Sequence, residues 1–261
     1  TADGRYFEHA DGTQFFWMND TAWNMLAKAS REEVDIYFAD RGAKGFNTTY
    51  VAALCEFKDI DEPNYYGDYP LINDDPSQPA VVPGDNNDYW DHLDYIIHKG
   101  AEHGMYVVVL AYMEKHRAWQ FDVSSAADYG NFLADRFGDE PNVMFMMGGD
   151  ANAPSQLPIT RACANAILAK LPDQLITYHP NWGGDVADWL ANESWYAYQI
   201  WQSSHVRDTG NYGYIYESWD KLPVRPAMDT EPNYEDAYGR GASADDRFND
   251  FDVRQKSYWG V

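Results

Sequence analysis

The feature that most constrains the fold is a regular alternation of short apolar runs and amphipathic segments along the 261 residues. The run from Met105 to Ala111 is almost continuously apolar and rich in valine, which is typical of a buried parallel strand. A strand followed by a helix recurs seven times. Regular alternation of this kind predicts a parallel sheet with helices outside it, and seven consecutive units favour a barrel over an open sheet.

Turn and capping signals set the expected boundaries. An N-terminal hairpin is predicted from Arg5 to His9 and from Gln14 to Met18, across Asp11-Gly12, with its second arm becoming the first barrel strand. The further strands are expected at 46–54, 105–111, 142–147, 174–178, 196–201 and 224–228. The helices are expected at 30–45, 88–104, 125–137, 159–171, 185–191, 212–219 and 246–260. A long polar loop runs to about residue 87 and is expected to be functional or disordered.

The expected fold class is therefore α/β, a (β/α)8 barrel of the TIM type with an N-terminal β-hairpin. We expect residues 1–261 to form one catalytic domain, because this length matches a single barrel. The seventh helix reaches the last residues of the sequence, so the eighth unit is expected to be missing or truncated.

The composition excludes several kinds of partner and site. The formal charge of −23 repels polyanions, so no nucleic-acid partner is expected. Two cysteines, Cys55 and Cys163, are too few for a disulfide scaffold or a thiolate metal site. The sequence has no run of about 18 apolar residues, so no membrane span is expected. The first residues do not resemble a signal peptide; we expect a secreted or periplasmic protein whose leader is absent from this chain, with the cytoplasm as the alternative.

Polar and aromatic side chains gather where the predicted strands end, which is where (β/α)8 enzymes carry their active sites. The candidates for catalysis or substrate binding are Asp20, Trp23, Glu114, Asp150, His179, Gln202, His205, Asp229, Glu231 and Tyr234. Most of the ten tryptophans are expected to pack in the core and loops, while a few could stack on sugar rings; examples outside periodic segments are Trp23, Trp119, Trp182, Trp201 and Trp219. No zinc-binding, nucleophilic-serine or phosphate-loop motif occurs, so neither a metal nor a cofactor is expected.

Asp150 follows the fourth predicted strand and Glu231 the seventh, so the two carboxylates are expected to face each other across a barrel mouth. That arrangement suits a glycoside hydrolase, whose carboxyl groups lie about 5–5.5 Å apart for retention and about 6.5–9.5 Å for inversion. Taken singly, Asp150 could be a turn residue and Glu231 an ion-pair partner. Asp229 shares a strand face with Glu231 and is expected to support it or to bind a sugar hydroxyl.

Several segments resemble the apiosidase-like family, glycoside hydrolase family 140. They include DGTQFFWMNDTAW at 11–23, FGDEPNVMFMMGGD at 137–150, LITYHP at 175–180, DTEPNYED at 229–236 and DVRQKSYW at 252–259. The resemblance implies that Asp150 is the acid/base, that Glu231 is the nucleophile, and that the mechanism is retaining. It also implies a substrate in pectin side chains, with apiose bonds in rhamnogalacturonan II as the characterised type.

The sequence also differs from the usual pattern of this family. The family usually continues into an eighth strand, an eighth helix and a C-terminal β-sandwich, which this sequence does not contain, and Asn19-Asp20 stands where Gly-Asp is common. The alternative hypothesis is a carbohydrate-binding barrel without catalysis, suggested by the aromatic strand ends and the missing eighth unit. A peptide-directed hydrolase is a third possibility, but no nucleophile–base or metal motif supports it.

Overall fold

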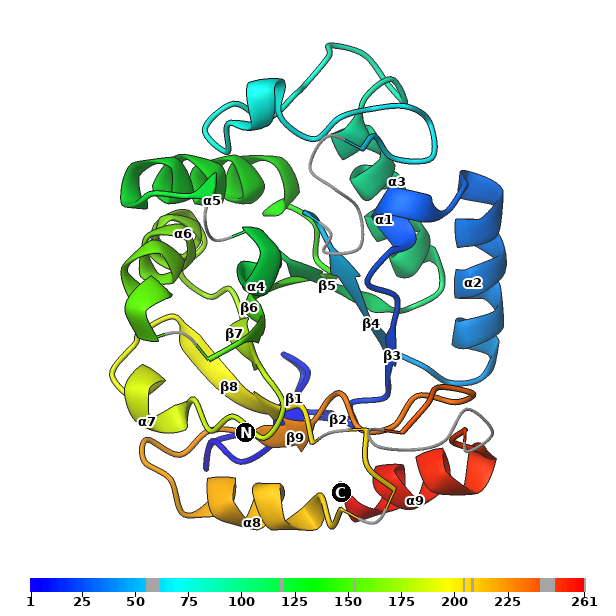
Figure 1. Cartoon of the computed structure of the whole chain (residues 1–261), viewed down its shortest axis with the longest axis vertical. Helices are drawn as coiled ribbons and strands as arrows, with labels where there is room; N and C mark the ends of the chain where they lie inside the picture. Colours follow the sequence, from blue (N-terminus) through cyan, green and yellow to red (C-terminus); the bar gives the residue numbers. More distant parts are fainter. Residues whose placement is uncertain are drawn as a thin grey trace. The chain divides into compact units, whose positions relative to one another are not determined.

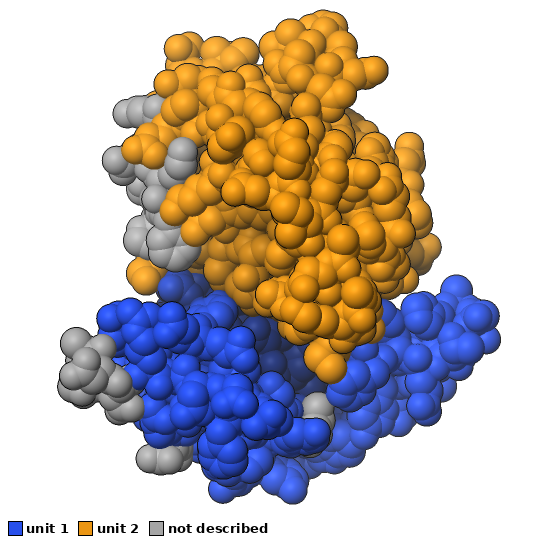
Figure 2. Space-filling view, turned by 90° about the vertical axis from the view of Figure 1, so that its right-hand side faces the viewer, with its two compact units in different colours: residues 1–16, 150–152, 177–261 blue, residues 17–149, 153–176 orange. Residues whose placement is uncertain are grey.

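The computed structural model describes residues 1–54, 62–117, 120–152, 154–203, 205–207, 209–239 and 247–260. The chain divides into two compact units, which are coloured separately in Figure 2. The first unit comprises residues 1–16, 150–152 and 177–261, and the second comprises 17–149 and 153–176. Within these ranges, seven parallel strands follow one another in the order of the chain, which confirms the predicted α/β barrel class.

The second unit carries four of these strands, namely β3 (Asn19–Thr21), β4 (Thr48–Ala52), β5 (Tyr106–Leu110) and most of β6 (Val143–Ala151). All neighbours pair in parallel, with Thr49 opposite Val107 and Val109 opposite Phe145. Every residue of β4 is buried, and so are all residues of β5 except Tyr106. Burial on both faces explains why these strands read as nearly unbroken apolar runs.

Helices lie outside these strands (Figure 1). The outer helices are α2 (Arg31–Ala43), α3 (Tyr89–Glu102), α5 (Val123–Phe137) and α6 (Leu157–Lys170). The short helices α1 (Met25–Lys28) and α4 (Glu114–Arg117) follow β3 and β5, and the 3₁₀ turns are η1 (Ile72–Asp74) and η3 (Pro154–Gln156). The capping box predicted at the start of α2 is present. Glu33 N donates to Ser30 Oγ at 3.3 Å, and Ser30 N donates to Glu33 Oε2 at 2.8 Å.

The first unit holds the hairpin of β1 (Phe7–Glu8) and β2 (Gln14–Phe15), and the strands β7 (Ile176–Pro180), β8 (Tyr196–Trp201) and β9 (Ala227–Asp229). Its helices are α7 (Ala187–Leu190), α8 (Tyr212–Trp219) and α9 (Asp250–Trp259). β8 and β9 are parallel, with Trp201 opposite Asp229. This register brings the ends of two strands, and the residues that follow them, to the same edge.

One predicted element is wrong. The second arm of the hairpin does not become the first barrel strand, because β2 ends at Phe15 and β3 is a separate strand. The backbone changes partner between them: Phe15 pairs antiparallel with Phe7, whereas Met18 N donates to the side chain of Asn47 and Met18 O accepts from Asn47 N.

Three strands end later than predicted, and β9 does so by one residue, at Asp229. β6 continues through Asp150 to Ala151, and β7 includes His179, so both side chains lie within the last residues of their strands instead of after them.

Cys55, Trp119 and the part of the long loop up to residue 61 lie outside the described residues. Among the residues that are described, no helix combines the length and the apolar character needed to cross a membrane.

Candidate active site

Asp150 projects from an unusual stretch of backbone at the end of β6. Gly148, Gly149 and Asp150 have φ values of 86°, 97° and 51°, all in the left-handed region. Glycine adopts such values freely, and aspartate tolerates them better than most residues, but a left-handed Asp still stores strain. Asp150 Oδ1 accepts a hydrogen bond from Gln202 Nε2 at 3.1 Å, and 23% of the side chain remains exposed. The turn therefore presents a partly accessible carboxyl group held by an amide.

Glu231 lies two residues beyond the end of β9 and is buried. Two imidazoles face its carboxylate. His179 Nε2 is 2.8 Å from Glu231 Oε2, and His205 Nε2 is 3.6 Å from Oε1. His179 comes from β7, whereas His205 follows β8, so three successive strands deliver the residues of this cluster.

The hydrogen-bond partners indicate which nitrogens of each imidazole are protonated. The N–H of Asp150 lies 3.5 Å from His179 Nδ1 and can only donate, so Nδ1 accepts and Nε2 carries the proton that faces Glu231. His205 Nδ1 lies 2.8 Å from the carbonyl of Pro232, which can only accept, so this nitrogen is protonated. The Nε2 of His205 faces a carboxylate, and this contact is favourable when it too carries a proton. His179 thus links the backbone of Asp150 to the side chain of Glu231.

These contacts decide the ionisation of Glu231. Burial by itself would raise the pKa of this carboxyl group, but hydrogen bonds from His179, His205 and Tyr234 together lower the pKa well below its ordinary value. Glu231 is therefore an ionised carboxylate near neutral pH, although it has almost no contact with solvent. An ionised, desolvated carboxylate is suited to act as a nucleophile.

The two carboxyl groups are close together. At least one oxygen of Asp150, one oxygen of Glu231 and one ring nitrogen of His179 lie within 4.8 Å of one another. Two carboxylates and an imidazole could also present donors to a divalent cation. Within this cluster, His179 Nε2 approaches Glu231 Oε2 to 2.8 Å.

The sequence matches the family model described as "Apiosidase-like, catalytic domain" over residues 1–261. The chain belongs to this family. The resemblance seen in the sequence is thereby confirmed, and membership identifies the apiosidase-like chain as a glycosidase-type catalytic domain, as predicted. No curated protein matches the sequence.

Solved structures agree with this assignment. A glycoside hydrolase family 5 protein from Bacteroides vulgatus ATCC 8482 is 30% identical with a TM-score of 0.91, and the alignment covers 99% of this chain and 58% of that one. A second structure, described as a glycoside hydrolase, is 29% identical with a TM-score of 0.90, and the alignment covers 99% of this chain and 61% of that one. The apiosidase-like chain thus spans about three fifths of the length of these two proteins.

More distant similarity shows the fold alone. An endo-1,4-β-D-mannanase from Thermotoga petrophila RKU-1 is 13% identical with a TM-score of 0.64, and the alignment covers 94% of this chain and 85% of that one. The shared architecture is the TIM-type barrel of glycoside hydrolases, which agrees with the predicted fold class.

The first unit of the apiosidase-like chain therefore gathers most of the predicted site. Asp150, His179, Gln202, His205, Glu231 and Tyr234 are joined by the contacts described above, and the ring of Tyr234 lies 5.1 Å from that of His205. Asp229 accepts a hydrogen bond from Asn211 Nδ2 at 2.7 Å, and its role, whether supporting Glu231 or binding a sugar hydroxyl, stays a prediction.

Three predicted residues lie in the second unit. Asp20 is 2.6 Å from Arg41 Nε, and Trp23 stacks on Tyr50 with ring centroids 5.4 Å apart. Glu114 is buried and accepts a hydrogen bond from Thr160 Oγ1 at 3.1 Å. These contacts show how each side chain is held within its unit, and substrate binding by all three stays a prediction.

One contributor to the site, a backbone carbonyl, was not singled out in the sequence. The carbonyl of Pro232 orients His205, and no sequence pattern signals the use of a backbone oxygen. Trp182 follows β7 and is 44% exposed, in a turn where Gly183 N donates to the carbonyl of Gln202. Its position directly after a strand end keeps Trp182 a candidate for sugar stacking.

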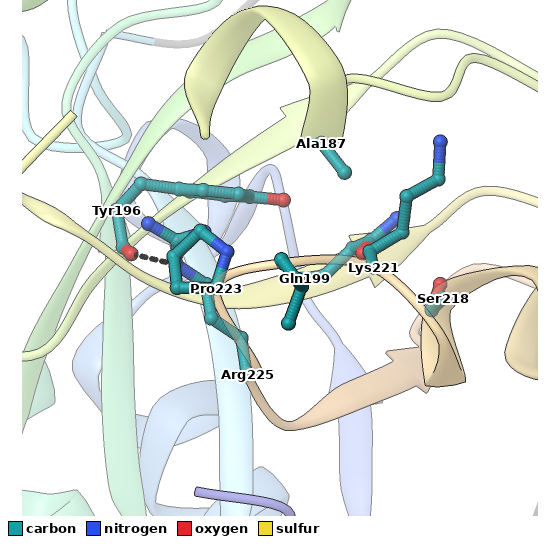
Figure 3. Close-up of a pocket in the computed structure, with 8 residues that line it drawn as sticks. Ala187, Tyr196, Gln199, Ser218, Lys221, Pro223 and Arg225 are labelled. Atoms are coloured by element: carbon teal, nitrogen blue, oxygen red, sulfur yellow. Dashed lines mark hydrogen bonds between the residues drawn. The ribbon is translucent and has the colours of Figure 1, made fainter. Parts of the chain in front are cut away.

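The first unit also has a small hollow, whose lining residues are drawn in Figure 3. It is lined by Ala187, Tyr196, Gln199, Ser218, Lys221, Leu222, Pro223 and Arg225. Tyr196 begins β8 and Arg225 precedes β9, so the hollow is near the N-terminal ends of these strands. It has room for about one water molecule. In barrels of this type the N-terminal ends of the strands contribute to stability and the C-terminal ends carry the active site. The hollow is therefore not a candidate active site.

Proposed function

We propose that this apiosidase-like domain hydrolyses a glycosidic bond with retention of configuration. The observation that carries the proposal is the approach of Asp150 and Glu231, which have carboxylate oxygens within 4.8 Å of each other. Retaining enzymes need carboxyl groups about 5–5.5 Å apart, whereas inverting enzymes leave about 6.5–9.5 Å for a water molecule. The short separation favours a covalent route, and it argues against a barrel that only binds sugars.

The two carboxyl groups would have different roles. Protonated Asp150 donates its proton to the leaving oxygen while ionised Glu231 attacks the anomeric carbon, which breaks the glycosidic bond and forms a glycosyl ester on Glu231. Asp150 then removes a proton from a water molecule that attacks the same carbon and releases Glu231. The lowered pKa of Glu231 supports the role of nucleophile, and the partly exposed Asp150 has access to the leaving group and to water.

The proposed substrate is an oligosaccharide or polysaccharide of the pectin side-chain type, with an apiose linkage as the first candidate. Family membership supports this choice. Such polymers lie outside cells, which supports a secreted or periplasmic location. The family match over residues 1–261 also supports one catalytic domain.

The test is a screen of pectin-derived oligosaccharides with the wild-type chain, Asp150→Asn and Glu231→Gln. We expect wild-type turnover and a loss of several hundredfold or more in both variants. On the substrate that is cleaved, NMR of the first product should show the anomer of the starting linkage. Inversion would remove the nucleophile role from Glu231, and full activity of Glu231→Gln would refute the assignment altogether.

A further inference from the structure

A buried amide connects the last helix of the first unit to the strand that leads to Glu231. Asn211 is completely buried and stands directly before α8, where an asparagine usually caps the helix by accepting from backbone N–H groups. Asn211 makes no such bond. Its Nδ2 instead donates to Asp229 Oδ2 at 2.7 Å and to the carbonyl of Lys256 in α9 at 2.9 Å.

The chemistry of the partners fixes the orientation of this amide. The carbonyl of Lys256 can only accept, and Asp229 Oδ2 accepts from the same nitrogen, so both hydrogens of Nδ2 are used. Turning the amide would place Oδ1 against two acceptors. In the observed orientation Oδ1 is buried and has no hydrogen-bond partner among the described residues. An unpaired buried carbonyl is unfavourable, which indicates that the side chain is retained for what its nitrogen holds.

Asp229 connects the side chain of Asn211 to the backbone of Glu231. It is the last residue of β9 and pairs with Trp201 of β8, and Thr230 N donates to the carbonyl of Trp201 at 3.0 Å. Burial raises the pKa of the Asp229 carboxyl group, while Ser203, Asn211 and the N–H of Glu231 favour its ionised form. Asp229 therefore lies between the amide of Asn211 and the backbone of Glu231.

Helix α9 makes further buried polar contacts with the segment before α8. Lys256 is fully buried and its Nζ donates to the carbonyl of Thr209. Asp252, one turn earlier in α9, is buried and lies 2.5 Å from Arg207 Nη1. Helix α9 thus contacts Arg207, Thr209 and Asn211, which lie between His205 and α8 in the chain.

We infer that Asn211 is a positioning residue for the nucleophile, acting through Asp229 to hold the backbone from which Glu231 projects. The inference deepens the proposed function and rests on it for the role of Glu231. The geometric part concerns only where Glu231 lies relative to His179, so it can be tested whether or not a substrate is known.

Two variants and a matched control test the inference. Asn211→Ala removes the amide, and Asn211→Asp keeps its size but replaces the donor with an acceptor beside Asp229. The control is Asn142→Ala. Asn142 is another buried asparagine whose Nδ2 donates to two carbonyls, those of Ile97 at 2.9 Å and Met105 at 3.1 Å, and whose Oδ1 is also unpaired among the described residues. It precedes β6, at the opposite end of the strand from Asp150.

We expect both Asn211 variants to fold, with KM within about threefold of the wild type and kcat reduced on the order of 10- to 100-fold, because a displaced nucleophile attacks less often from a bound substrate. Asn142→Ala should keep wild-type kcat. In crystal structures of the Asn211 variants, the 2.8 Å separation of His179 Nε2 from Glu231 Oε2 should lengthen beyond hydrogen-bond range.

Each alternative result overturns the inference. An unchanged His179–Glu231 separation would do so whatever the activity, and an equal fall of kcat in Asn142→Ala would make the effect one of general stability. Unfolding of both Asn211 variants would assign Asn211 to maintaining the fold. Full activity of Glu231→Gln would instead refute the proposed function, while the crystallographic separation would still decide the positioning role.

Discussion

Replacing His179 by alanine should separate the electrostatic support of Glu231 from the rest of the site. His179 Nε2 lies 2.8 Å from Glu231 Oε2, and the imidazole is almost completely buried. A hydrogen bond to an ionised group contributes about 1.5–3 kcal/mol, and about 1.4 kcal/mol corresponds to a factor of ten, so kcat/KM should fall about 10- to 150-fold. The 3.5 Å contact with the N–H of Asp150 is long and should add little.

The pH profile gives the sign of the effect. His179 helps to lower the pKa of Glu231, so its removal raises that pKa toward the ordinary value near 4.3. The acidic limb of kcat/KM, which reports the ionisation of the nucleophile in the free enzyme, should therefore move to higher pH in His179→Ala. His179→Gln, whose amide can still donate to Glu231, should recover part of the activity.

His98 provides a control with the same chemistry at the surface. Its Nε2 lies 3.0 Å from Glu140 Oε1, but its side chain is 59% exposed, where such pairs contribute about 0–1 kcal/mol. His98→Ala should keep wild-type kinetics in the same assay with the substrate found by screening. If His179→Ala kept kcat/KM within about threefold of the wild type and an unmoved acidic limb, the assigned support of Glu231 would be wrong.

Two further predictions concern stability. Gly149→Ala places a methyl group against Met113 Sδ and 3.1 Å from Met113 Cα at a φ of +97°, so strain and crowding of about 1–3 kcal/mol each should lower the melting temperature by roughly 4–20 °C. Gly67→Ala, with φ +90° and open space around it, should lose less, and equal losses would exclude crowding as a cause. The lowered pKa of Glu231 means that its ionisation stabilises the fold above about pH 4.3 and that this contribution fades as the pH falls further. Denaturant titrations should accordingly show the wild type losing stability more steeply than Glu231→Gln below that pH, and parallel curves would contradict the shift.

Much of the fold was predictable because the signals are local. The strand at 196–201 and the helix at 212–219 have the expected bounds, and the capping box at Ser30 begins a helix as predicted. The hairpin arm was wrong because alternation of apolar residues does not show where a backbone changes partner. The end of β6 was placed too early because a Gly-Gly-Asp sequence reads as a turn, although its left-handed residues continue the strand.

The sequence by itself determined the parallel α/β order and brought the residues after successive strands to one edge, because chain direction and strand polarity are written in the order of the elements. It also made Asp150 and Glu231 candidates. Only the tertiary structure decided that two imidazoles from different strands face Glu231, that its carboxylate is ionised although buried, and that Asn211 connects β9 to α9. The reason is that ionisation and hydrogen bonding depend on which groups meet in space, and residues 179, 205, 211 and 256 are too far apart in the chain for any local pattern to pair them.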